Sequence, residues 1–77
     1  MTVQRGTPVP PSRQIAAIWR ERIQRGELAA GARIPSRIDL AAEHGVSPET
    51  AAKAVRILRD EGLVEVVPGY GVFVAET

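Results

Sequence analysis

A three-residue break between two helix-like segments constrains the fold of this chain more than any other feature. The first segment ends at Gly45, where glycine commonly closes a helix in the left-handed conformation. The second begins at Ser47-Pro48, which places serine at the N-cap position and proline at the first helical position. Val46 is the apolar residue that lies between the two helices. Two helices joined this tightly predict a helix-turn-helix.

The two segments on either side of this break have clear start signals and faces. Ser36 followed by Asp39 resembles a capping box, with aspartate in place of the preferred glutamate. In the segment from 47 to 61, one face carries apolar residues (Ala51, Ala54, Val55 and Leu58) and the opposite face carries charged ones (Glu49, Lys53, Arg56 and Asp60). We therefore expect the charged face to be exposed to water. Four small residues, Ala41, Ala42, Ala51 and Ala54, are expected on the buried faces, where they allow a close approach.

A third helix is predicted before the helix-turn-helix. Residues 1–11 are rich in proline and lack periodicity, which predicts a flexible or extended arm. Ser12 is the expected N-cap, and Gly26 the expected end of this helix. The apolar stripe between them consists of Ile15, Ile18, Trp19 and Ile23, and Trp19 is expected in the core.

The C-terminal part of the chain predicts a hairpin. Residues 63–67 favour a strand, residues 68–71 (Pro-Gly-Tyr-Gly) a turn, and residues 72–74 a returning strand with Phe73 in the core. Arg33-Ile34 is expected to form a very short strand. The predicted fold class is mainly α with a small β-hairpin: a winged helix-turn-helix with three helices and a two- to three-stranded antiparallel wing, spanning residues 12–75. This shape fits duplex DNA, with the second helix of the helix-turn-helix in the major groove.

Composition excludes several functional classes. The chain has no cysteine, so it lacks thiolate metal sites and disulfides, and His44 is its one histidine. We expect His44 to lie at a helix end, where the helix dipole favours it. Ser47 with His44 does not indicate a hydrolase, because the serine is needed as a cap. We expect no enzymatic activity, cofactor or effector site, and no contact with a membrane. The N-terminus has no signal-like or membrane-spanning run, which favours a cytoplasmic location.

The charge distribution is more informative than the net charge of +1. Residues 1–40 carry seven arginines against three acids, and residues 41–77 carry three bases against six acids. Nine of the ten bases are arginine, whose planar fork suits phosphate and guanine. An excess of arginine in the first half is compatible with a DNA partner, although each arginine could also serve only to solvate a helix face.

Many separate positions along the chain together form one pattern. They are Gly26-Glu27-Leu28, Gly31, Ile34-Pro35-Ser36, Asp39-Leu40-Ala41, Gly45-Val46-Ser47, Thr50, Ala54-Val55, Leu58, Glu61-Gly62-Leu63-Val64 and Gly69-Tyr70-Gly71-Val72-Phe73-Val74. With these residues the chain, over residues 12–75, strongly resembles the winged helix-turn-helix domain of the GntR family of bacterial transcriptional regulators. The resemblance implies a sequence-specific, double-stranded DNA-binding regulator, usually continued by an effector-binding and dimerising domain. A chain that stops at Thr77 fits either a short member or a separated domain.

The resemblance also implies which positions read DNA. Ser47, Thr50 and the wing glycines Gly69 and Gly71 match the family, together with Ser36 at the start of the preceding helix. Arginines usual in the family are replaced by Ile38, Pro48 and Ala52. This implies weaker binding than usual or a different operator.

Five further residues have two interpretations each. Arg37 is either a shifted substitute for the family's arginine or a solvated side chain. Lys53 meets phosphate or pairs with Glu49 four residues earlier, and Glu49 accepts a bond from cytosine or repels phosphate. Arg56 continues that face towards the DNA backbone. Tyr70 at the wing tip contacts DNA or lies back on the sheet.

Two functions remain open at this point. The first is a DNA-binding regulator, for which tight binding requires a homodimer on a two-fold operator, because one domain offers only a small interface. The alternative is a winged-helix protein-interaction module without specific DNA binding. It requires an exposed apolar patch, for which the candidates are Val64, Val66, Tyr70 and Val72.

Overall fold

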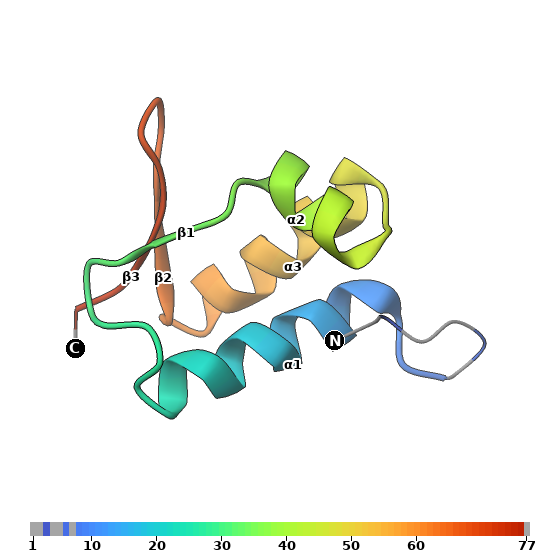
Figure 1. The fold of residues 1–77 in the computed structure, drawn as a ribbon, viewed down its shortest axis with the longest axis horizontal. Coiled ribbons are helices and arrows are strands. Elements are labelled where there is room, and N and C mark those ends of the chain that lie inside the picture. Colours follow the sequence, from blue (N-terminus) through green and yellow to red (C-terminus); the bar gives the residue numbers. More distant parts are fainter. Residues whose placement is uncertain (1–2, 4–5, 7, 77) are drawn as a thin grey trace.

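The computed structural model of the chain describes residues 3, 6 and 8–76. Its elements follow in the order α1 (Pro11–Gln24), β1 (Arg33–Ile34), α2 (Arg37–His44), α3 (Pro48–Asp60), β2 (Val64–Val67) and β3 (Gly71–Val74). The three helices form one layer, and the hairpin of β2 and β3 stands beside them with its tip projecting away from α1 (Figure 1). The predicted winged helix-turn-helix is confirmed.

Both helices of the helix-turn-helix begin at the predicted caps. The Ser36 hydroxyl accepts a hydrogen bond from the backbone N–H of Asp39 at 3.3 Å, and the Ser47 hydroxyl accepts one from that of Thr50 at 3.2 Å. Gly45 ends α2 with a φ of 68°, a left-handed conformation that β-carbon sterics make costly for other residues. The prediction for α1 was wrong at its start, because Pro10 is the N-cap and makes no side-chain cap bond. Proline at the first helical position, Pro11, fixes the helix start in place of Ser12.

Helix α3 is the central element of the core, since α1, α2 and β2 all pack against it. Ala51 and Ala54 have no exposed surface, and Ala41 on α2 is also buried, so the helices approach closely at these positions. Ala42 was expected among them but is exposed. It lies about 100° around the helix from the buried Ala41, which turns it to the solvent side.

The two short strands and the hairpin join into one antiparallel sheet in the order β1-β3-β2. In register, Ile34 pairs with Val72 and Arg33 with Phe73, while Val64 pairs with Val74 across the hairpin. Ile34, Val64, Val72 and Val74 are buried, so this face of the sheet covers the helices. Phe73 is only partly buried, which contradicts the expected core position. Alternation along β3 turns it to the outer face because Val72 and Val74 face inward.

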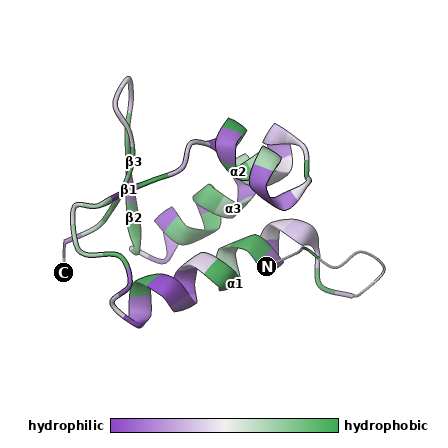
Figure 2. Ribbon diagram, in the orientation of Figure 1, coloured by the Kyte–Doolittle hydropathy of each residue, from purple (hydrophilic) through white to green (hydrophobic). Residues whose placement is uncertain are grey.

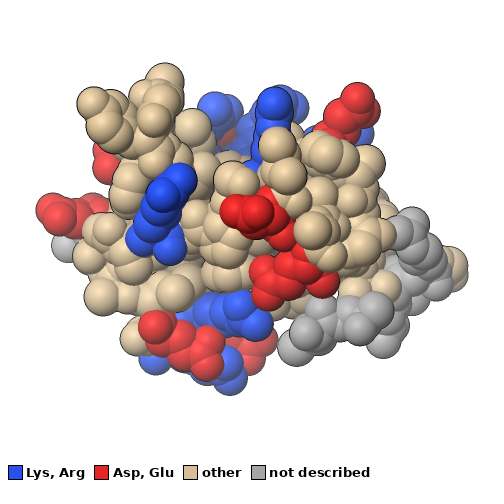
Figure 3. Space-filling view, turned by 45° about the horizontal axis from the view of Figure 1, so that its top comes forward, with Lys and Arg blue, Asp and Glu red and all other residues tan. Residues whose placement is uncertain are grey.

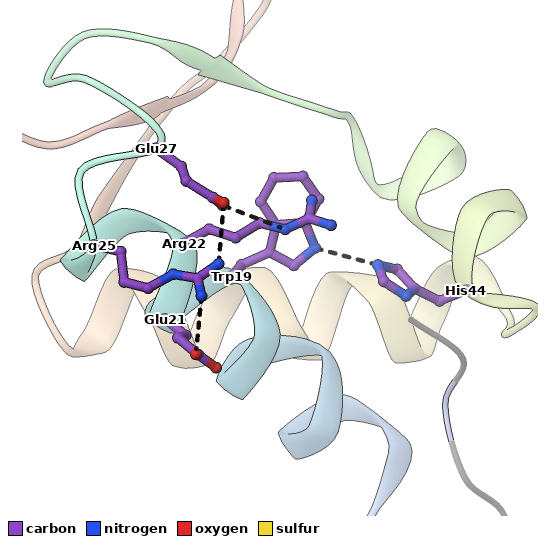
Figure 4. Close-up of polar contacts among 6 residues, drawn as sticks. All are labelled: Trp19, Glu21, Arg22, Arg25, Glu27 and His44. Carbon is purple, nitrogen blue, oxygen red and sulfur yellow. Dashed lines mark hydrogen bonds and ion pairs between the residues drawn. The ribbon is translucent and has the colours of Figure 1, made fainter.

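Trp19 lies in the core as predicted, and it binds the one buried polar side chain among the described residues. The indole Nε1–H of Trp19 donates a hydrogen bond to His44 Nε2 at 3.2 Å, and His44 is 5% exposed (Figure 4). The imidazole therefore accepts at Nε2 and is held in the core between α1 and α2. His44 is the last residue of α2, as predicted, but its burial against Trp19 was not predicted.

Part of the predicted N-terminal arm cannot be compared with the structure. Residues 1–2, 4–5 and 7 lie outside the described residues, and Val3 is buried against the core. The middle of α1 is hydrophobic, whereas its C-terminal turns are mostly hydrophilic (Figure 2). In the described part of the chain, no helix combines the length and apolar character needed to cross a membrane.

Candidate nucleic-acid interface

The charged face of α3 is exposed as predicted. Glu49, Lys53 and Arg56 are all exposed and lie three or four residues apart, so they form one stripe along the helix. Ala51, Ala54, Val55 and Leu58 on the other side of α3 are buried. The buried side anchors the helix and leaves the charged stripe free to contact a partner.

A shallow hollow follows this stripe and reaches the start of α2. It is lined by Arg37, Pro48, Glu49, Ala52, Lys53 and Arg56. Of the two interpretations of Lys53, the ion pair with Glu49 does not form. Within the described chain, neither Arg37 nor Arg56 has a carboxylate within 4.0 Å. The arrangement therefore presents three unpaired cations against one acid.

A second hollow of about 250 Å³ separates α3 from the wing. Its floor is apolar (Ala52, Val55, Val66 and Val72), and its rim carries Arg37, Arg56 and Arg59. Arg59 was not predicted from the sequence, and Val66 was predicted only as part of a possible protein-binding patch. The signal for Arg59 was its position three residues after Arg56, which places it on the same side of the helix. In Figure 3, Lys and Arg side chains gather at the upper edge between the wing and the helices, whereas both signs mix at the lower edge.

The cap of α3 leaves one hydroxyl proton available. The Ser47 hydroxyl donates to Thr50 Oγ1 at 3.0 Å while accepting from the Thr50 amide. The Thr50 hydroxyl is therefore an acceptor within the protein, and its own proton has no acceptor among the described residues. At α2 the Ser36 hydroxyl donates instead to Asp39 Oδ2 at 3.1 Å, so both of its bonds stay within the cap.

The wing tip is a tight turn with an exposed aromatic. The Tyr70 N–H donates to the Val67 carbonyl at 3.0 Å, and Gly69 has a φ of +82°, as the third position of a type II turn after proline requires. Tyr70 is 73% exposed, so it does not lie back on the sheet. Gly69, Tyr70 and Gly71 thus lie on the projecting wing, apart from the cations of α3, and Gly71 alone also borders the second hollow.

An ion pair fixes the end of α3 relative to α1. Arg20 Nε and Nη2 each donate to a Glu61 carboxylate oxygen at 2.6 Å. These hydrogen bonds lower the pKa of Glu61 below its ordinary value and raise that of Arg20. Since Glu61 directly follows α3, the pair holds the C-terminal end of α3 against α1.

Charged side chains in the C-terminal half of α1 contact other side chains of the protein. Arg25 lies within 4.0 Å of both Glu21 and Glu27, and the Arg22 guanidinium stacks over the Trp19 ring at 4.6 Å from its centroid (Figure 4). Arg37, Lys53 and Arg56, which have no acidic partner among the described residues, thus differ from Arg20, Arg22 and Arg25 of α1, which each lie within 4.0 Å of a carboxylate.

Comparison with known proteins gives one family over nearly the whole chain. The sequence profile of the bacterial regulatory proteins of the gntR family matches residues 3–74. The mannosyl-D-glycerate transport/metabolism system repressor MngR of Escherichia coli (strain K12) is 42% identical over 67 residues, which is 87% of this chain and 28% of MngR. The histidine utilization repressor of Klebsiella aerogenes is 39% identical over 72 residues, which is 94% of this chain and 30% of that protein. The chain thus spans less than a third of the length of these relatives.

A solved structure of a protein–operator complex has the same fold. The DNA-binding domain of AraR in complex with operator ORX1 superimposes with a TM-score of 0.91 at 29% identity. The match covers 97% of this chain and 95% of that domain. This similarity extends over all three helices and the wing.

Proposed function

The chain belongs to the GntR family of bacterial regulatory proteins, and we propose that it is the sequence-specific DNA-binding domain of a transcriptional regulator. Helix α3 enters the major groove, and the wing contacts the flanking backbone or minor groove. The observation that carries this proposal is the exposed stripe of Glu49, Lys53 and Arg56, which no other described element covers. The AraR DNA-binding domain, which has the same fold, was solved in complex with an operator, and this supports DNA as the partner.

Phosphate contacts supply most of the affinity in this proposal. Arg37, Lys53, Arg56 and Arg59 surround the two hollows beside α3, with Glu49 as the one acid among the lining residues. Each cation that neutralises a phosphate releases condensed counterions, so binding should weaken steeply with salt. The apolar floor of the second hollow is suited to the sugar face of a DNA strand that passes between α3 and the wing.

Base contacts come from the start of α3 and from the wing. The free proton of the Thr50 hydroxyl can reach phosphate, and its methyl group can contact a thymine methyl. Glu49 can accept a bond from cytosine N4. The full set of proposed DNA-contacting residues is Ser36, Arg37, Ser47, Glu49, Thr50, Lys53, Arg56, Gly69, Tyr70 and Gly71.

The proposal extends to assembly and location. A single domain of this kind buries roughly 600–1,000 Å² of its surface on DNA, which is small for tight binding. We therefore propose a homodimer on a two-fold operator, acting in the cytoplasm. Half-sites would then lie one helical turn apart or a multiple of it, about 34–36 Å for one turn.

Selection of bound duplexes from a random pool tests the proposal. The purified chain should enrich a short motif, and a fluorescence titration of that duplex should show affinity that falls as salt rises from about 50 to 200 mM. An inverted repeat among the selected sequences would support the dimer, and single half-sites would count against it. Absence of salt-dependent, duplex-dependent binding would contradict the function itself.

The protein-interaction alternative has one observation in its favour. Val66 and Tyr70 on the wing are 43% and 73% exposed. Val64 and Val72, the other members of the expected patch, are 2% and 8% exposed, so they face the core and the patch does not form. A partner retained by the chain after nuclease treatment, together with no DNA binding, would favour this alternative.

A further inference from the structure

Arg33 lies on the face of the wing that points away from α3. It is on β1, where it pairs with Phe73, and the neighbouring pair Ile34 and Val72 is buried against the helices. Because side chains alternate along a strand, Arg33 belongs to the outer face of the sheet. The sequence analysis assigned this residue no role beyond a short strand.

The Arg33 guanidinium lies against the backbone of Gly71, next to the wing turn. A β-carbon on Gly71 would lie 2.8 Å from Arg33 Nε and 3.4 Å from Cζ. The absence of a side chain at Gly71 therefore lets the arginine lie flat along β3 towards the tip. The positive charge is in this way held at the base of the turn that contains Tyr70.

The charge of Arg33 is not neutralised within the described chain. Arg20, Arg22, Arg25 and Arg59 each lie within 4.0 Å of a carboxylate. Arg33 is exposed and forms no such pair with any described residue. The nearest acid on its face of the sheet by register is Glu65, which lies two strands away, at about 10 Å. An exposed arginine that lies beside Gly71 and has no acidic partner among the described residues is available for an external anion.

We propose that Arg33 binds a DNA phosphate on the outer side of the wing. The inference rests on the proposed function, since it requires the wing to lie in or beside the minor groove. A wing in that position has one sugar–phosphate strand on each side. Arg56 and Arg59 face the strand between the wing and α3, and Arg33 faces the opposite strand. Arginines on both sides of the wing thus contact phosphates of the two DNA strands. These contacts position the wing on the duplex without recognising the base sequence.

The salt dependence of binding measures this contact directly. The unmodified chain and Arg33→Gln are titrated with one selected duplex and one unrelated duplex at several salt concentrations. Loss of one phosphate contact should reduce the slope of log K against log salt by about 0.9 and weaken binding about fivefold at low salt, equally for both duplexes. Arg33→Lys keeps the charge, so it should retain the slope.

Arg25→Gln is the matched control, because it removes the same charge from the exposed end of α1, where Arg25 is paired with Glu21 and Glu27. For this variant, the slope of log K against log salt should equal that of the unmodified chain. An unchanged slope for R33Q, or an equal loss in R25Q, would overturn the inference. A loss shared by R33K would also overturn it, because the arginine would then act by supporting Gly71. Failure of the unmodified chain to bind any duplex would contradict the proposed function and, with it, this contact.

Discussion

The Ser47 and Thr50 hydroxyls have different roles, one in capping α3 and one in the proposed DNA contact. Ser47 is occupied by the cap, since it accepts from the Thr50 amide and donates to Thr50 Oγ1. Thr50 is left with a proton to donate at the exposed start of α3. A serine-type cap and a DNA contact can thus lie three residues apart without competing for the same group.

The substitution Thr50→Val tests the proposed contact. Valine has nearly the same side-chain shape as threonine, and the Ser47 hydroxyl can still accept a hydrogen bond from the backbone N–H of residue 50. The free energy of unfolding should therefore change by less than about 0.5 kcal/mol. Duplex affinity should fall about fivefold, the equivalent of one hydrogen bond of about 1 kcal/mol. Fluorescence titration and urea unfolding measure the two quantities. Unchanged affinity would remove Thr50 from the interface.

Residue roles were predictable from the sequence where a local rule fixes them. The exposure of Glu49, Lys53 and Arg56 follows from helical periodicity alone. His44 was not predictable in this way, because its partner Trp19 lies 25 residues away on another helix. Arg33 depends on Gly71 and on strand pairing, which local spacing does not reveal.

At the level of elements, α3 depends on its N-terminal cap. Ser47→Ala removes the acceptor for the Thr50 amide and should lower the free energy of unfolding by about 0.5–2 kcal/mol. Urea unfolding should show a lower midpoint with an unchanged slope. Ser12→Ala is the matched control, because Ser12 is inside α1 and caps no helix. Equal effects of the two substitutions would contradict the assigned cap.

The link between α1 and the end of α3 should make stability depend on pH. Since the pKa of Glu61 is lowered in the folded state, its pairing with Arg20 contributes fully above the ordinary value of about 4.5. The contribution is lost as the pH falls through the lowered pKa. Glu61→Gln should therefore have a melting temperature that falls less between pH 6 and pH 3 than that of the unmodified chain. Glu49→Gln, which removes an unpaired carboxylate, is the control and should show the same pH dependence of melting as the unmodified chain. If the melting temperature of E61Q fell with pH as much as that of the unmodified chain, the link between α1 and α3 would be contradicted.

Helix ends were more predictable than sheet order. Gly45 and Ser47 mark the turn of the helix-turn-helix through backbone preferences that need no other element. The β1-β3-β2 order depends on where two residues, Arg33 and Ile34, meet the hairpin. A two-residue strand has too little periodicity to specify its partner. The start of α1 was misplaced for a related reason, since both Pro11 and Ser12 are acceptable near a helix start.

For the whole molecule, arrangement matters more than total charge. The net charge is only +1, yet most cations beside α3 and the wing have no acidic partner among the described residues, while Arg20, Arg22 and Arg25 of α1 each lie within 4.0 Å of a carboxylate. This asymmetry gives the domain one face suited to a polyanion. The sequence showed the excess of arginine in the first half, but folding places Lys53, Arg56 and Arg59 from the acidic second half on that face.

The most direct test maps the surface that meets DNA. Backbone amide chemical shifts of the 77-residue chain are followed by NMR as a selected duplex is added. The largest changes should fall in residues 47–56 and 68–71, with little change around Glu21 and Arg25 on α1. Chemical-shift changes confined to α1 or α2, with residues 47–56 unaffected, would contradict the central claim that the exposed face of α3 enters the groove.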